Sequence, residues 1–290
     1  MGICEKWTIS YRLRNGTKTL PDDLKTPFKS LPNTWRYWRA DPFLVESDGK
    51  NWIFAELFDR LRLKGVLGCC ELTDAGTGKW KIILDEPFHL SYPFVFFCQG
   101  RWYMIPESCE AGKIILYQAT DFPWHWERVT ELADIAGADS TVVETANGRY
   151  MVTVRVEDQK GDLVIMRMDN GFSLSDLRAV YEKEDPNVRP AGRVFFRNGE
   201  LIRPAQDCSQ GYGYGLNFMV VRKLDDTSFE EELLCKVLPT DVTITGVGKP
   251  EGIHTYNFTD HYEVIDHKEY EFGLVSKIGG VIRRIKKKLR

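Results

Sequence analysis

Hydrophobic and polar residues alternate along this chain in short runs, and glycine-containing turns separate the runs at regular intervals. Alternation with a period of two is typical of β-strands with one buried face, and an Asp-Gly or Asn-Gly pair between two such runs predicts a β-hairpin. A third apolar run follows each hairpin, as in "GVLGCCEL" and "KIILYQAT". The turn glycines are Gly49, Gly100, Gly148 and Gly199, spaced 51, 48 and 51 residues apart. A weaker fifth copy, "EGIHTYNFTDHYEVID", has Thr-Asp in place of the glycine turn.

This repeat predicts the fold. A period of about 50 residues with three or four antiparallel strands per unit is typical of a β-propeller. We therefore expect an all-β, five-bladed β-propeller over residues 1–272, with blades that start near residues 39, 91, 138, 190 and 251. Residues 5–14 alternate like a strand without a partner nearby, so we expect them to form the outer strand of the last blade and close the ring. A β-sandwich of separate hairpins is the alternative, although a sandwich does not require fixed spacing.

Polar residues recur at equivalent positions of the repeats. Seven residues after the glycine, at the end of the second strand, the repeats have Glu56, Glu107, Arg155 and Gln206. Eight or nine residues before it, where the first strand begins, they have Asp41, Tyr92 and Asp139, and Arg193 and His254 lie near the corresponding place in repeats four and five. Because the first strands of propeller blades line the central channel, we expect these side chains to converge at one end of it.

The expected pocket combines acidic and aromatic side chains. Its polar members are Asp41, Glu107, Asp139, Arg203, Gln206, Asp207 and His254, and its aromatic rim is Trp38, Phe43, Tyr92 and Phe94. Such a set suits carbohydrates, because a sugar ring has apolar faces and a rim of hydroxyl groups. Glycosyl transfer and hydrolysis also need two carboxyl groups in different environments, one ionised and one protonated. Retaining and inverting outcomes both remain open.

Composition restricts the compartment and the cofactors. The seven cysteines are odd in number and form no C-x-x-C pair, which argues against a disulfide framework or a zinc site and for a reducing compartment. No apolar run approaches the length of a membrane span, and the N-terminus lacks the apolar core of a signal peptide. We expect a cytoplasmic protein with no metal and no cofactor.

The net charge of −3 conceals a basic tail on an acidic body. Residues 277–290 hold seven of the 39 basic residues and no acid, so the other 276 residues carry 32 basic and 42 acidic groups. Residues 273–290 are predicted to form a short amphipathic helix that lies on an anionic membrane surface, at the inner face of the cell membrane. The residues expected to contact the membrane are Ile278, Ile282, Arg283, Arg284, Ile285, Lys286, Lys287 and Lys288. A helix docked on the propeller and a disordered tail are the alternatives.

Nucleic acid is not an expected partner, because the acidic body would repel phosphates.

Several motifs resemble a known family. The segments "WRADPF", "SYPFVF", "WYMIPES", "ADST", "LIRPAQDCS" and "GIHTYN" resemble the N-terminal domain of plant glucosamine inositolphosphorylceramide transferase and its bacterial relatives in polysaccharide biosynthesis. The resemblance runs from about residue 35 to residue 267. More distantly, the pattern is similar to the five-bladed superfamily of furanosidases, invertases and mannoside phosphorylases.

The resemblance implies roles for individual residues. It implies catalytic roles for Asp41 as base or nucleophile, for Asp139 as a modulator of the acid, and for Glu107 as the only well-placed glutamate after the first blade. The superfamily usually has its acid on a later blade, where this chain has "RPAQD" instead. The residues expected to bind substrate are Arg39, Glu56, His89, Tyr92, Arg193, Arg203, Gln206, Asp207, His254 and Asn257.

The departure from the superfamily pattern favours one function over two others. An arginine such as Arg203 or Arg193 suits a phosphate group, so we expect glycosyl transfer from a sugar nucleotide or sugar phosphate in the synthesis of a cell-surface glycan. The alternatives are a glycoside hydrolase or phosphorylase of the propeller type, and a non-catalytic sugar-binding propeller.

Overall fold

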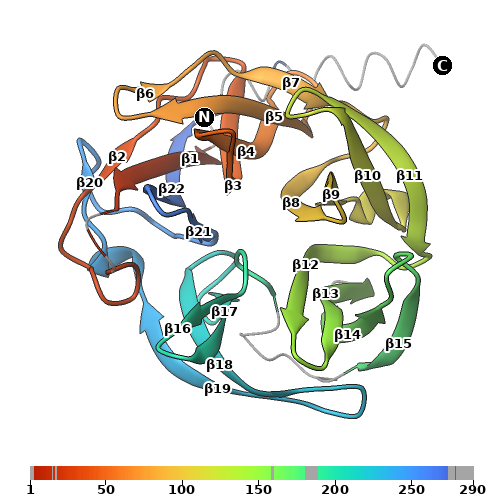
Figure 1. Ribbon diagram of the computed structural model, residues 1–290. Helices are drawn as coiled ribbons and strands as arrows, with labels where there is room; N and C mark the ends of the chain where they lie inside the picture. The colour runs from red at the N-terminus through yellow and green to blue at the C-terminus, as the bar shows by residue number, and fades with distance from the viewer. Residues whose placement is uncertain are drawn as a thin grey trace.

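The computed structural model is a ring of five β-sheets around a central axis (Figure 1). It describes residues 3–273, apart from 15, 17, 158–159 and 180–188, together with Ile278. The five-bladed propeller predicted from the repeat is confirmed. Within the described residues the only helical segments longer than one residue are the short 3-10 turns Cys109–Ala111 and Pro239–Asp241. The predicted C-terminal helix falls outside the described residues, except for the exposed Ile278.

Each of the first four blades is a consecutive antiparallel meander. The first blade consists of β3 (Tyr37–Ser47), β4 (Lys50–Asp59) and β5 (Lys64–Thr73), with β6 (Gly76–Thr77) and β7 (Lys81–Leu84) both paired to β5. The second consists of β8 (Ser91–Cys98), β9 (Arg101–Glu107), β10 (Ile114–Asp121) and β11 (His125–Ala133). The third consists of β12 (Gly137–Thr145), β13 (Gly148–Glu157), β14 (Lys160–Met168) and β15 (Leu174–Ala179). The fourth consists of β16 (Phe195–Arg197), β17 (Glu200–Asp207), β18 (Gly215–Leu224) and β19 (Phe229–Val237).

The fifth blade joins the two ends of the chain. From the axis outward its strands are β21 (Tyr256–Phe258), β22 (Tyr262–Phe272), β1 (Ile3–Leu13), β2 (Phe28–Ser30) and β20 (Ile244–Thr245). β1 pairs with β22 from Ile3 opposite Phe272 to Leu13 opposite Tyr262, so the N-terminal strand closes the ring. It is not the outer strand that we expected. The chain folds back after β1, so β2 covers its free edge and β20 then pairs with β2.

The inner strands of the first three blades share a backbone feature that the repeat did not reveal. Asp41, Tyr92 and Asp139 have φ values of 52°, 43° and 52°, and the ladder to the second strand shifts register at each of them. A left-handed backbone is tolerated by aspartate but is uncommon for an aromatic residue, and local strain of this kind clusters at functional sites. The bulges therefore lie at the three positions where the sequence predicted site residues.

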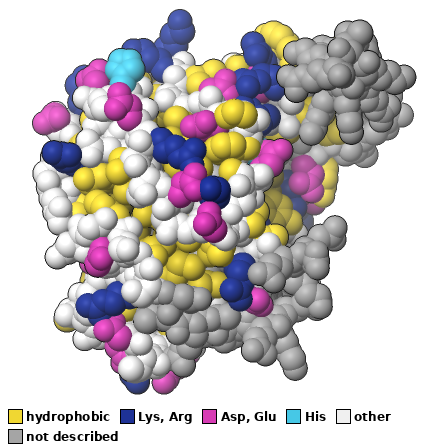
Figure 2. Space-filling model, turned by 90° about the vertical axis from the view of Figure 1, so that its right-hand side faces the viewer, with side chains coloured by type: hydrophobic (Ala, Val, Ile, Leu, Met, Phe, Trp, Pro, Cys, Tyr) yellow, Lys and Arg dark blue, Asp and Glu magenta, His cyan; other side chains and the backbone are white. Residues whose placement is uncertain are grey.

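Apolar side chains fill the space between neighbouring blades. Phe43 of the first blade and Phe94 of the second are both fully buried, with ring centroids 5.7 Å apart. On the face shown in Figure 2, hydrophobic side chains are exposed between charged side chains of both signs. Among the described residues no helix has the length and hydrophobicity needed to cross a membrane.

Candidate active site

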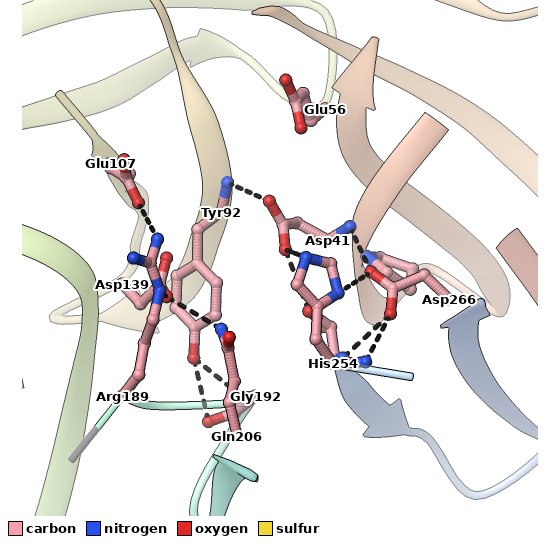
Figure 3. Close-up of polar contacts among 12 residues, drawn as sticks. Asp41, Glu56, Tyr92, Glu107, Asp139, Arg189, Gly192, Gln206, His254 and Asp266 are labelled. Carbon is pink, nitrogen blue, oxygen red and sulfur yellow. Dashed lines mark hydrogen bonds and ion pairs between the residues drawn. The ribbon is translucent and has the colours of Figure 1, made fainter. Parts of the chain in front are cut away.

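Hydrogen bonds and ion pairs at one end of the ring connect polar side chains from all five blades (Figure 3). Tyr92 lies at the centre of this arrangement and is fully buried. Its backbone N–H donates to Asp41 of the first blade at 3.2 Å. Its hydroxyl lies 2.8 Å from the Thr141 hydroxyl of the third blade and accepts a hydrogen bond from the Gly192 N–H of the fourth at 2.8 Å. Tyr92 therefore braces the inner strands against one another.

Gly192 can make this contact because it has no side chain. Its φ is 136°, and a Cβ atom there would lie 2.0 Å from the carbonyl oxygen of Tyr256. This is a position where glycine supplies both an unusual backbone conformation and a close approach. The segment that precedes β16 can therefore come close enough for the Gly192 N–H to reach Tyr92.

Asp41 forms one half of the site together with the fifth blade. Its Oδ1 accepts a hydrogen bond from the Thr255 hydroxyl at 2.9 Å and lies 3.6 Å from His254 Nε2. Its own backbone N–H donates to Asp266 at 2.9 Å. Burial raises the pKa of Asp41 above its ordinary value, and the negative charges of Asp139 and Asp266 add to this, while His254 opposes it.

Asp139 forms the other half with Glu107 and the fourth blade. Its Oδ2 accepts hydrogen bonds from Arg189 Nε and, at 3.1 Å, from Gln206 Nε2. Arg189 also donates to Glu107 at 3.1 Å, so one guanidinium joins two carboxylates. Burial, together with the charge of Glu107, raises the pKa of Asp139 to about 7, although Arg189 opposes the shift. The Arg189 side chain is 25% exposed to solvent. It is therefore a cation that a ligand can reach in this half of the site.

Glu56 is a third buried carboxyl group at this end of the ring. It lies on β4 opposite Ala40, next to the bulge at Asp41. His89 lies beside it, with Nε2 3.3 Å from Glu56 Oε1. Burial raises the pKa of Glu56 well above its ordinary value, and the charges of Asp41 and Glu107 raise it further. Burial also lowers the pKa of His89, so burial favours the neutral form of both side chains.

The structure places five of the predicted site residues elsewhere. Arg39 is buried between strands, donates to the Pro32 carbonyl at 2.7 Å and lies over Trp80. Arg203 is buried in an ion pair with Glu231 of β19. These side chains do not join the carboxylate cluster, and neither do the three described next.

Asp207 is also buried, but it accepts from the Ser209 N–H at 2.9 Å and from Lys236 at 3.0 Å. Arg193 donates to the Val95 carbonyl at 2.7 Å and lines a groove of about 410 Å³ near the hairpin turns, away from the strand starts that carry the cluster. Asn257 bridges the Arg193 N–H and the Pro42 carbonyl, which makes it a brace between blades. The expected aromatic rim is also incomplete, because Phe43 and Phe94 are core residues and Trp38 stacks on Phe58.

Two members of the cluster, Arg189 and Asp266, were not predicted. Asp266 lies on the second strand of the fifth blade at the same end as Glu56, Glu107 and Gln206 on theirs. The same pattern is present there, but three residues lie between β21 and β22, whereas two lie between β3 and β4. The number of residues after the turn therefore does not identify Asp266. Arg189 precedes the short inner strand β16, outside any recognisable alternation.

Asp41, His254 and Asp266 are close enough to be considered as metal ligands, since one ligand atom of each lies within 4.8 Å of the others. Their donor atoms are already used. Asp266 accepts three backbone N–H groups, from Asp41, His254 and Thr255, and lies 2.7 Å from His254 Nδ1. The arrangement therefore fits an internal ion pair better than an open metal site.

Comparison with known proteins identifies the family. A family model described as "Glucosamine inositolphosphorylceramide transferase 1, N-terminal" matches residues 32–242. The chain belongs to this family. It is 31% identical over 204 residues to the Arabidopsis thaliana protein named glucosamine inositolphosphorylceramide transferase 1, and 32% identical to the protein of that name from Oryza sativa subsp. indica. Each alignment covers 66% of this chain but 26% and 27% of those proteins, so the chain spans about a quarter of their length. The resemblance found in the sequence is confirmed.

Solved structures share the fold. The chain is similar to the catalytic domain of the Coprinopsis cinerea GH62 α-L-arabinofuranosidase, with a TM-score of 0.57, 13% identity, and coverage of 79% of this chain and 90% of that one. It is also similar to the native Bacillus subtilis arabinanase Arb43A, with a TM-score of 0.53, 10% identity and coverage of 79% and 93%. At these identities the likeness shows a common five-bladed architecture.

The family match does not cover the whole site. Asp41, Glu107, Asp139 and Arg189 lie within residues 32–242, whereas His254 and Asp266 lie beyond them. The part of the site in the matched region therefore depends on the fifth blade for the groups that surround Asp41.

Proposed function

We propose that this chain is a carbohydrate-active enzyme that transfers a glycosyl group from a phosphorylated sugar donor, in the synthesis of a cell-surface glycan. The name of its plant relatives, a transferase, supports transfer, and the fold it shares with glycoside hydrolases supports a sugar substrate. The observation that carries the proposal is the site itself, in which Arg189 is a partly exposed cation beside carboxyl groups with unlike environments.

In the proposed reaction Asp41 is the base. It takes the proton from an acceptor hydroxyl while the acceptor oxygen bonds to the anomeric carbon of the donor. The bond from that carbon to the phosphate oxygen breaks, and the phosphate leaves with the electron pair. Arg189 binds the leaving phosphate, because a guanidinium presents a planar pair of donors that matches its oxygens. Arg189 replaces Arg203 and Arg193 in this role.

A second candidate function is glycoside hydrolysis or phosphorolysis, and the environment of Glu56 favours it. These reactions need a carboxylic acid that keeps its proton at neutral pH to protonate a poor leaving group. The raised pKa of Glu56 favours its protonated form, whereas Glu107 forms an ion pair with Arg189. Glu56 would then be the acid and Asp41 the base or nucleophile. A non-catalytic sugar-binding propeller is the third candidate, because the same groups can bind hydroxyls without reacting.

Asp41→Asn separates the three candidates. Asparagine tolerates the left-handed backbone at this position, and its amide can keep both hydrogen bonds, accepting from Tyr92 N–H and donating to the Thr255 hydroxyl. We expect turnover of a donor and acceptor to fall by about 10²–10⁴-fold while donor binding changes little, because a general base contributes about that factor. Asp207→Asn is the matched control, a buried carboxylate outside the cluster.

Donors are found first by thermal stabilisation with sugar nucleotides and sugar 1-phosphates, since a ligand at 100 times its dissociation constant adds about 2.7 kcal/mol. Release of the phosphate product with an added acceptor then reports transfer. Cleavage of glycosides without a phosphorylated donor would support the second candidate. Equal turnover by the two variants would refute a catalytic Asp41.

We also propose that the protein is cytoplasmic and that its tail lies on the inner face of the cell membrane. The support is compositional: residues 277–290 have seven basic residues and no acid, interspersed with isoleucines. Such a segment binds anionic lipids through charge and apolar burial together. It would hold the propeller close to a membrane-bound acceptor.

A further inference from the structure

The side chain of His254 is held rigidly between two carboxylates. Its ring stacks on Trp7 with centroids 3.8 Å apart and planes 15° apart, and Tyr212 packs edge-on at 5.4 Å. The close packing depends on Gly213, where a Cβ atom would lie 2.6 Å from Trp7. Because the ring cannot turn away, Nδ1 faces Asp266 at 2.7 Å and Nε2 faces Asp41 at 3.6 Å.

Asp266 is built to remain ionised behind this ring. Its side chain is completely buried, yet its two oxygens accept backbone N–H groups from three residues, two of them from the segment that carries His254. Hydrogen bonds to the charged form of a carboxylate favour ionisation. Burial alone would raise the pKa of Asp266, but His254 and these donors lower it below its ordinary value.

Three other charged groups lie near the ring: Asp139 acts in the same direction, Lys268 lies over Trp7, and Arg189 lies 5.1 Å from the Tyr212 ring centroid. Asp139 on β12 adds a further negative charge that favours the imidazolium when its carboxyl group is ionised. Lys268 on β22 lies 5.5 Å from the Trp7 ring centroid and donates to the Tyr212 carbonyl. Burial lowers the pKa of His254, but Asp266, Asp41 and Asp139 together raise it above its ordinary value. Both ring nitrogens face carboxylate oxygens, which suits a ring that carries a proton on each.

We propose that His254 is a positioning residue, held as an imidazolium by Asp266, whose charge keeps the buried Asp41 ionised. Asp41 needs such a partner, because it lies among Asp139, Asp266 and Glu56 in a place that burial makes unfavourable for a charge. Without the imidazolium, Asp41 would hold a proton at neutral pH and could not act as a base. The role of Asp41 as a base rests on the proposed function, whereas the charge state of the pair does not.

The test is an NMR titration of the protein without any sugar. The chain has five histidines, so His254→Gln identifies the His254 ring nitrogens in ¹⁵N spectra, and Asp41→Asn identifies the Asp41 carboxyl carbon. In the unaltered protein we expect the ¹⁵N shifts of a doubly protonated His254 ring at pH 7 and an ionised Asp41. A neutral His254 ring at pH 7 would overturn the proposal. The shifts are measured in the unaltered protein, and the variants serve only to assign them.

The variant gives the second arm of the test. In His254→Gln we expect the pKa of Asp41 to rise by at least one unit, a tenfold change in its proton affinity. His261→Gln is the control, because His261 pairs with Glu46 at 3.2 Å in the turn of the same hairpin but is largely exposed. An Asp41 titration that is unchanged in His254→Gln would refute the proposal.

With an active donor and acceptor, the acidic limb of the pH–rate profile should move upward by the same amount in His254→Gln. A purely structural role would lower the rate without moving that limb. If the NMR arms succeed and no phosphorylated sugar binds, the proposed function fails and the role of His254 stands.

Discussion

Asp139→Asn should make the protein more stable at pH 8, even though it removes a predicted catalytic group. The carboxyl is 2% exposed, and burial is the main reason that its pKa lies at about 7 instead of 3.8. Asparagine fits the left-handed backbone, and its oxygen can accept from both Arg189 and Gln206 as Asp139 Oδ2 does. The Asn amide would face Glu107, which interacts with the Asp139 side chain. The substitution therefore removes a charge without leaving donors unpaired.

The sign and size follow from proton linkage. The folded protein keeps the Asp139 proton up to about pH 7, whereas the unfolded chain releases it near 3.8, so the native protein loses stability as pH rises between these values. A shift of about 3 pKa units corresponds to about 4 kcal/mol at pH 8 and less than half of that at pH 5, at about 1.36 kcal/mol per unit. With an unfolding entropy of about 2 cal/mol/K per residue, the gain at pH 8 is about 7 °C in melting temperature.

Urea unfolding of both proteins at pH 5, 6, 7 and 8 measures the difference. We expect the advantage of Asp139→Asn to grow steadily over this range, while turnover is lost. Asp207→Asn is the control with the opposite sign, because Ser209 and Lys236 outweigh burial and lower the pKa of Asp207. An Asp139→Asn protein that is less stable at pH 8, or whose advantage does not vary with pH, would refute the reasoning.

Two further predictions concern the ring closure and the tail. Arg12→Met should lower the free energy of unfolding by about 3–5 kcal/mol, because it leaves Glu263 of β22 in a buried site without its 2.7 Å ion pair. Arg222→Met, which breaks exposed pairs only, should cost at most about 1 kcal/mol in the same denaturation experiment. Deleting residues 277–290 should abolish co-sedimentation with vesicles that contain anionic lipid, and raised salt should weaken binding of the intact chain. Unchanged binding by the shortened chain would rule out the tail as the anchor.

The fold could be predicted from the sequence because its signals are local. A two-residue turn such as Asp48-Gly49, with both φ values positive, is fixed by the residues at the turn, and a regular spacing of such turns fixes the repeat. The starts of the inner strands could be found in the same way, which is why the sequence predicts Asp41, Tyr92 and Asp139 as site residues. Their bulges could not be found, because alternation gives the face of a residue and not its backbone angle.

The rest of the site depends on distances along the ring that sequence does not give. Arg203 and Asp207 could have been excluded, because residues an odd number of positions from Gln206 on β17 face the opposite side of the blade. Asp266 was missed because a longer turn displaced it, and Arg189 because no strand pattern surrounds it. Positions that share a turn geometry were predictable, and positions that only the closed ring brings together were not.

The pairing of β1 with β22 also constrains when the molecule can assemble during translation. The partners are separated by about 250 residues, so β1 has no β22 to pair with until nearly the whole propeller has been synthesised. Until then Asp41 has neither His254 nor Asp266 beside it. A ribosome-bound chain that ends before residue 254 therefore holds four blades and an incomplete central cluster, which links completion of the site to the last step of folding.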